Sequence, residues 1–210
     1  MDPINGLLDL LRSVARLVMH VIARGLNKMS GGRISPNFIT ITALLMHIPI
    51  AYLIGTDQNL WAALLLVIFG MFDALDGELA RLQKRASNAG MLLDASTDRM
   101  KETILYIGAA YAISQTELKN WAAWAVAACG ASICVSYVKA KGETAVAGGT
   151  LTANEVNRLF QDGLFRFEVR MAILIIGLLA DGLLTAVIII AIASTYTVFE
   201  RLIKISRKLH

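Results

Sequence analysis

Residues 38–55 read FITITALLMHIPIAYLIG, a stretch with no Asp, Glu, Lys or Arg. A helix needs about 20 mostly apolar residues to cross the hydrocarbon core of a bilayer. Two similar uncharged runs follow, and three shorter apolar runs border on charged residues. In chain order, these five runs are Leu60–Phe72, Ile104–Ser114, Trp121–Val138, Met171–Ala180 and Gly182–Phe199. We therefore expect an all-α integral membrane protein with six transmembrane helices.

The composition supports the same class. Hydrophobic residues make up 56% of the 210 residues and charged residues only 17%, whereas soluble domains have about 25% charged residues. Such a chain could not cover its apolar surface in water, which argues against a soluble enzyme, a nucleic-acid binder and a disordered protein. The formal net charge of +4 is better explained by membrane topology than by a nucleic-acid partner.

The basic residues predict the orientation in the membrane. The loops at 56–59 and 180–182 contain no Lys or Arg, and the loop near 114–120 contains only Lys119. The remaining basic residues fall near the termini and the other two loops, which the positive-inside rule places in the cytoplasm. We expect a multi-pass protein of the cell membrane with both termini and the acidic residues described below on the cytoplasmic side.

The N-terminal segment Pro3–Met29 has a different pattern. Basic residues or His recur every four positions, and Leu and Val occupy the other face. This pattern predicts an amphipathic juxtamembrane helix that lies on the cytoplasmic leaflet; a cleaved signal peptide fits less well, because charges interrupt every apolar stretch. The expected division is a helix and turn over residues 1–33, followed by a transmembrane domain over residues 34–210.

Residues 72–100 read FDALDGELARLQKRASNAGMLLDASTDRM and contain four aspartates in two pairs. Asp73 and Asp76 are three residues apart and share one helix face, and Asp94 and Asp98, four apart, share a face of the next helix. Two antiparallel helices joined by a short loop would place all four at similar depth. Since four carboxylates repel one another near hydrocarbon, we expect divalent cations, and oxygen ligands suit Mg²⁺, Mn²⁺ or Ca²⁺. The alternative is a set of helix-end acids paired with neighbouring Arg and Lys.

Small residues follow the first pair of acids. Gly77 lies directly after Asp76, and glycine within a helix costs about 1 kcal/mol relative to alanine. Its common advantage is the close approach of a ligand or of another backbone, although helix packing in the membrane would also explain it. Ala80 extends the same narrow face, and Arg81 could then bind a phosphate with two hydrogen bonds.

This pattern resembles the full signature of the CDP-alcohol phosphotransferase family. The matching positions are Asp73-x2-Asp76-Gly77-x2-Ala80-Arg81-x8-Gly90-x3-Asp94-x3-Asp98. The resemblance implies a metal-dependent enzyme that transfers a phosphoalcohol from a CDP-linked donor to an acceptor hydroxyl and releases CMP. It also implies a homodimer.

The same resemblance implies roles for individual residues. Two divalent ions, Mg²⁺ or Mn²⁺, would be held by Asp73, Asp76, Asp94 and Asp98. The CDP moiety would lie beside Asp76, Gly77, Ala80, Arg81 and, at the start of the first span, Asn37. For Asn37, capping of that helix is an equally good explanation. Asp98 would be the general base that accepts the proton of the incoming hydroxyl.

The second half of the chain indicates the acceptor. Five basic residues should lie at one depth on the cytoplasmic side: Lys139, Lys141, Arg166, Arg170 and Arg201. A ring of cations would suit an acceptor that carries its own phosphate, although positive-inside anchoring would explain any single member. Residues 136–143, SYVKAKGE, resemble a stretch of the prokaryotic phosphatidylinositol phosphate synthase branch.

We therefore expect an enzyme of phospholipid biosynthesis that transfers the phosphatidyl group of a CDP-lipid, CDP-diacylglycerol or an archaeal equivalent, to inositol phosphate. The same reaction with glycerol 3-phosphate or another alcohol is the second hypothesis. A cation transporter is the third, but a transporter would place its acidic residues near the middle of the bilayer and often in repeated halves.

Overall fold

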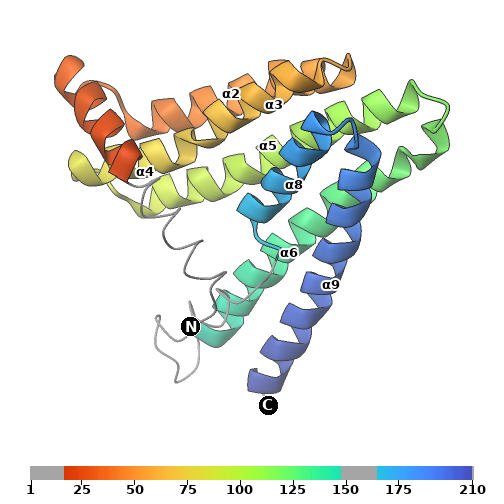
Figure 1. Cartoon of the computed structure of the whole chain (residues 1–210). Helices are drawn as coiled ribbons and strands as arrows, with labels where there is room; N and C mark the ends of the chain where they lie inside the picture. The colour runs from red at the N-terminus through yellow and green to blue at the C-terminus, as the bar shows by residue number, and fades with distance from the viewer. Residues whose placement is uncertain (1–16, 148–164, 210) are drawn as a thin grey trace. The chain divides into compact units, whose positions relative to one another are not determined.

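The computed structural model describes residues 17–147 and 165–209, and this part of the chain is helical throughout, without a strand (Figure 1). A helix over residues 17–29 comes first. The elements that follow are α2 (Pro36–Gly55), α3 (Asn59–Gly70), α4 (Phe72–Leu82), α5 (Asn88–Ser114), the short 3-10 helix η1 (Lys119–Trp121), α6 (Ala123–Ala147), α8 (Phe167–Leu179) and α9 (Leu183–Leu209).

Four helical segments of the described residues are long and apolar enough to cross a membrane. They are Pro36–Gly55, Asn59–Leu82, which joins α3 and α4, Lys119–Ala145 and Leu183–Arg207. α5 has the length but carries charged residues in its first half, and α8 has only 13 residues, or roughly 20 Å of helix. The protein is therefore a multi-pass membrane protein, and the count of six spans stays a prediction.

The chain divides into two compact units. Unit 1 comprises Met1–Pro49 and Leu64–Lys101, and unit 2 comprises Ile50–Ala63 and Glu102–His210. All four signature aspartates belong to unit 1, and all five predicted acceptor-binding cations belong to unit 2. The predicted division after residue 33 is a different one and stays a prediction.

The core of unit 1 attaches the N-terminal helix to the signature helix. Met19 and Ala23 of that helix are buried in one cluster with residues of α2 and α4, namely Ile39, Leu75 and Leu79. On another face of the same helix, Leu17 and Val21 are more than half exposed, as an interfacial helix would require. The first part of the predicted helix, residues 3–16, lies outside the described residues.

The turn between the N-terminal helix and α2 is built as the sequence predicts. Gly31 and Gly32 both have positive φ, 58° and 76°, a conformation that glycine adopts at no steric cost. α2 then begins at Pro36, whose fixed φ suits the first turn of a helix.

Unit 2 is held together by close helix packing. α6 packs along α9, and α8 also packs on α9. Where α2 meets α5 in this unit, a Cβ added to Gly108 would lie 2.9 Å from Cα of Ala51. Only a glycine allows this approach, and small residues at such crossings are the usual means of helix packing in membranes.

Candidate functional site

Three of the four signature aspartates converge in unit 1. Asp73 and Asp76 of α4 and Asp94 of α5 each offer a carboxylate oxygen, and the three oxygens lie within 4.8 Å of one another. Asp73 and Asp76 lie close together because residues three apart project from the same side of a helix, as predicted for α4. We call these three residues the carboxylate group.

The most buried member of the carboxylate group is held from α2. Thr40 is 4% exposed and Asp76 is 6% exposed, and the Thr40 hydroxyl donates a hydrogen bond of 2.5 Å to Oδ2 of Asp76. This bond fixes the carboxylate and leaves its other oxygen for a further partner.

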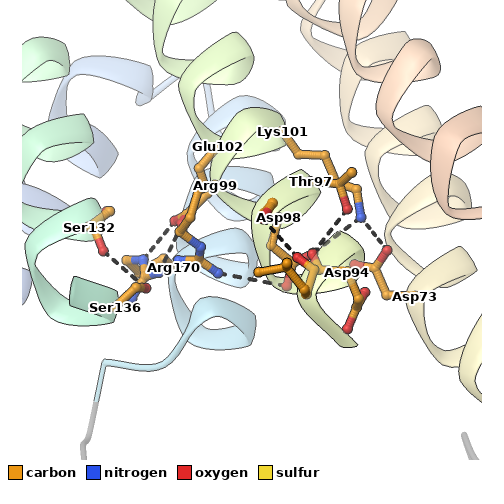
Figure 2. Close-up of polar contacts among 12 residues, drawn as sticks. Asp73, Asp94, Thr97, Asp98, Arg99, Lys101, Glu102, Ser132, Ser136 and Arg170 are labelled. Carbon is orange, nitrogen blue, oxygen red and sulfur yellow. Dashed lines mark hydrogen bonds and ion pairs between the residues drawn. The ribbon is translucent and has the colours of Figure 1, made fainter. Parts of the chain in front are cut away.

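Asp98 lies outside the carboxylate group and shares a cation with it. The ammonium of Lys101 donates hydrogen bonds to Oδ1 of Asp73 and, at 3.2 Å, to Oδ1 of Asp98 (Figure 2). Oδ2 of Asp98 also lies 3.7 Å from the guanidinium of Arg99. The structure therefore brings the predicted base beside the predicted metal ligands, with a lysine among them.

The carboxylate group fits a divalent cation. Oδ1 of Asp94 is buried, and it has no hydrogen-bond partner among the described residues. A buried oxygen without a partner is costly, and a bound cation would provide one. Three carboxylates also exceed the single ammonium beside them, and a set of carboxylate oxygens without His or Cys is typical of Mg²⁺ or Mn²⁺ sites.

The predicted nucleotide residues lie on the next turn of α4. Among the described residues, a Cβ on Gly77 would meet only the Arg81 guanidinium within 4 Å, at 3.8 and 3.9 Å. Arg81 is held there by a 2.6 Å bond to Oε1 of Glu78, whose Oε2 lies 3.2 Å from Nδ1 of His20. The nucleotide-binding role of Gly77 and the packing alternative both stay predictions.

Asn37 is exposed at the start of α2. Its Oδ1 lies 3.9 Å from the position that a Cβ on Gly90 would take. The start of the first span and the signature glycine of α5 thus approach each other in unit 1, and the nucleotide-binding role of Asn37 stays a prediction.

Arg170 of α8 is placed differently from the expectation of a phosphate-binding surface. Its side chain is 1% exposed, and its guanidinium makes a two-bond ion pair of 2.8 and 3.0 Å with the fully buried Glu102 of α5 (Figure 2). A third bond of 2.8 Å reaches the carbonyl oxygen of Phe165. This arrangement favours a structural role, and the acceptor-binding role of Arg170 stays a prediction.

Arg201 of α9 is also buried, but its hydrogen-bond partners differ from those of Arg170. It is 7% exposed and donates one bond of 3.0 Å, to the carbonyl oxygen of Val135. Its Nε is buried, and no hydrogen-bond partner for it occurs in the part of the chain that the structure describes. No carboxylate partner of this guanidinium occurs among residues 17–147 and 165–209, and such a buried cation is suited to an anionic ligand.

The other three predicted cations are more accessible. Lys139 pairs weakly with Glu143 at 3.7 Å, and the ammonium of Lys141 lies 5.9 Å from the centre of the Tyr137 ring. Arg166 directly precedes α8. Lys139 and Lys141 are exposed and Arg166 is half-buried, so all three are more open to solvent than Arg170 and Arg201.

Three residues that complete these arrangements are not among the predicted site residues: Thr40, Lys101 and Glu102. A signal existed for Lys101, because it follows Asp94 and Asp98 by seven and three residues and so shares their helix face. Thr40 is one turn after Asn37 and shares its face in the same way. Glu102 gave no such signal, since its partner is 68 residues away.

The comparison with known families agrees with the signature. The family model described as CDP-alcohol phosphatidyltransferase matches residues 33–199. The chain belongs to this family. The match includes all the signature positions and four of the five predicted cations of unit 2, since it ends two residues before Arg201. The enzyme is therefore a CDP-alcohol phosphatidyltransferase.

Curated relatives of this family member cover nearly its whole length. A phosphatidylinositol phosphate synthase of Corynebacterium glutamicum is 28% identical over 91% of this chain and 85% of its own. An archaetidylinositol phosphate synthase of Pyrococcus horikoshii is 28% identical over 84% of this chain and 86% of its own.

Solved structures share the fold. The crystal structure of the Mycobacterium tuberculosis phosphatidylinositol phosphate synthase with CDP-DAG bound is 24% identical, with a TM-score of 0.75 over 90% of this chain and 93% of its own. A second structure of that protein, in complex with manganese and citrate, has the same TM-score at 23% identity, over 90% of this chain and 88% of its own.

Proposed function

We propose that this phosphatidyltransferase moves the phosphatidyl group of a CDP-lipid to a hydroxyl of inositol phosphate and releases CMP. The observation that carries the proposal is the carboxylate group of unit 1, which lies in the segment that matches the family. The choice of acceptor rests on two curated relatives that are 28% identical over most of the chain. One is a bacterial phosphatidylinositol phosphate synthase, and the other is an archaeal archaetidylinositol phosphate synthase. Both phosphatidyl and archaetidyl donors fit that set.

In this proposal, the metal ligands are Asp73, Asp76, Asp94 and Asp98. Bound Mg²⁺ or Mn²⁺ would offset the negative charge that develops on the departing CMP. Thr40 keeps Asp76 oriented through its hydrogen bond.

The donor's CDP moiety would be bound by Asn37, Gly77, Ala80 and Arg81. The open face at Gly77 would admit the nucleotide, and the Arg81 guanidinium can bind a phosphate with two parallel hydrogen bonds. Asp98 would accept the proton of the attacking hydroxyl, a role for which a carboxylate must come within about 3 Å of that hydroxyl.

The acceptor's phosphate would be bound by Lys139, Lys141, Arg166, Arg170 and Arg201. Among these, Arg201 has the strongest physical support, because the described residues leave the buried Nε of its guanidinium without a hydrogen-bond acceptor. Arg170 has the weakest support, because Glu102 already occupies it.

The finer features of the topology belong to the same proposal. We infer six transmembrane helices. Two of them, α5 and α8, lack a full apolar span. We also infer a juxtamembrane helix that includes residues 17–29. The distribution of Lys and Arg supports cytoplasmic termini and a cytoplasmic active site. A homodimer is also part of the proposal, from the family resemblance.

The test is a measurement of CMP release by the purified protein with CDP-diacylglycerol or its ether-lipid equivalent, Mg²⁺ or Mn²⁺, and separate acceptors. We expect CMP release with inositol phosphate and its loss on chelation of the metal. Release with glycerol 3-phosphate alone would replace the proposed acceptor with the second hypothesis. No release with any acceptor would overturn the enzymatic proposal.

A further inference from the structure

The N-terminal helix, residues 17–29, is joined to α4 by two polar contacts as well as by the apolar core of unit 1. Near the end of the helix, Nε2 of Gln83 donates a hydrogen bond of 2.9 Å to Oδ1 of Asn27. About two turns earlier in the helix, Nδ1 of His20 lies 3.2 Å from Oε2 of Glu78. Only the second contact leads toward the predicted nucleotide residues.

Glu78 connects His20 to Arg81. Its Oε1 accepts the 2.6 Å hydrogen bond from the Arg81 guanidinium, while its Oε2 faces His20. An ionised carboxylate only accepts hydrogen bonds, so Nδ1 of His20 carries the proton in this contact. Both oxygens of the carboxylate are thus bonded, one from its own helix and one from a helix that lies 58 residues away in the sequence.

The environment of Glu78 makes this link firmer than an ordinary surface ion pair. An exposed Arg–Glu pair one turn apart contributes little, because both side chains move. Here the side chain of Glu78 is only 13% exposed and that of His20 33%, whereas that of Arg81 is 62% exposed. The first two therefore fix the carboxylate, and the carboxylate holds an arginine that is open to a ligand.

The guanidinium of Arg81 is held beside Gly77, where its two terminal nitrogens lie 3.8 and 3.9 Å from the position of an added Cβ. The bond to Glu78 uses Nη2. A guanidinium carries five N–H donors, so it can bind a phosphate while Glu78 holds it.

We propose that His20 is a positioning residue of the donor site. Through Glu78, it fixes the Arg81 guanidinium beside Gly77, where the guanidinium binds a phosphate of the CDP-lipid. The N-terminal helix is then part of the donor site and not only an anchor on the membrane. This inference rests on the proposed function, because it takes Arg81 as a ligand of the CDP moiety.

The experiment is a double-mutant cycle on the affinity for CDP. Isothermal titration calorimetry measures the Kd with Mg²⁺ and the full chain in lipid nanodiscs. We expect His20→Leu to raise the Kd by about three- to tenfold, and to have no further effect in the Arg81→Gln protein, because residues of one hydrogen-bonded network are not additive. If His20 only stabilised the fold, His20→Leu would weaken binding by the same factor in both backgrounds.

Asn27→Leu is the matched control. It removes the other polar contact between the same helix and α4, and leaves the contacts of Glu78 unchanged, so the Kd for CDP should stay within about a factor of two of the wild type. His20→Asn should restore most of the affinity, since its amide nitrogen is two bonds from Cβ, as Nδ1 of His is. If His20→Leu does not fold, Glu78→Gln tests the same link and should also raise the Kd. If Arg81→Gln binds no CDP, the control and the His20→Asn variant decide the question.

An unchanged Kd for CDP in folded His20→Leu would overturn the inference, and so would an equal rise in Asn27→Leu. A wild type that binds no CDP would overturn both the inference and the proposed function. A wild type that binds CDP, with the expected loss in His20→Leu, yet releases no CMP with any acceptor, would sustain the role of His20 and refute the proposed function.

Discussion

The two compact units bury charged residues in contrasting ways. In unit 1, Asp73, Asp76 and Asp94 place their oxygens within 4.8 Å of one another. One oxygen of Asp94 is buried, and none of the described residues bonds it. In unit 2, Arg170 and Glu102 are both buried and make a complete two-bond ion pair. The first arrangement has a surplus of one sign of charge, whereas the second is balanced.

The balance of charge distinguishes buried residues that would bind a ligand from buried residues that stabilise the fold. A balanced buried pair needs no ligand, and breaking it leaves an uncompensated charge in a low-dielectric interior. A surplus of carboxylates is costly until a cation joins it. By the same criterion, Arg201 is the unbalanced residue of unit 2, because its buried Nε has no partner among the described residues.

The largest effect is expected at Asp98. Asp98→Asn removes the proton acceptor, so CMP release should fall by about 10²–10⁴-fold, while binding of the CDP-lipid weakens only modestly. Activity and donor binding should be measured separately. Asp57→Asn is the matched control, because Asp57 is exposed in a turn at φ 60°, which Asn tolerates well. Near wild-type turnover by Asp98→Asn would rule out its role as the base.

The balanced pair of unit 2 should respond in stability. Arg170→Met leaves Glu102 buried without its partner, and the free energy of unfolding should fall by about 3–5 kcal/mol. Replacing both residues, as Arg170→Met with Glu102→Leu, should recover much of this loss. Thermal unfolding in detergent measures both variants. If Arg170→Met instead kept its stability and raised only the KM for inositol phosphate, Arg170 would belong with the acceptor site.

Arg201 should show the reverse behaviour. Arg201→Gln removes an incompletely bonded buried cation, so stability should change little, while the KM for inositol phosphate rises by about tenfold. The KM for the CDP-lipid should stay unchanged. Arg207→Gln, at an exposed position of the same helix, is the control. Equal increases in both KM values would point to a packing role and would remove the contrast with Arg170.

The smallest effect concerns the orientation of Asp76. Thr40→Val removes a buried hydroxyl that bonds this carboxylate at 2.5 Å, at a cost of about 1 kcal/mol, and should weaken Mn²⁺ binding a few-fold. Thr40→Ser should restore it. Thr42→Val is the control, since the Thr42 hydroxyl bonds only the Phe38 carbonyl oxygen, at 2.7 Å. Unchanged Mn²⁺ binding in Thr40→Val would show that α2 does not orient the carboxylate group.

The convergence of the acids could be predicted because it depends on local periodicity. Asp73 and Asp76 had to share a face once their segment was helical, and a short loop had to bring α5 back beside α4. The partners of these acids could not be predicted in the same way. Thr40 contacts Asp76 only because α2 packs on α4 with a particular rotation, and a rotation about the helix axis leaves no trace in the spacing of residues.

By itself, the sequence determined that this chain is a helical membrane protein with an acidic signature on two neighbouring helices, because apolar length and helical spacing are properties of single segments. Only the tertiary structure decided which buried charges are balanced and which are not. Lys101 meets two carboxylates, Arg170 pairs with Glu102, and Nε of Arg201 has no partner in the described part of the chain. These outcomes depend on contacts between segments far apart in the chain, where sub-ångström packing decides which oxygen each nitrogen can reach.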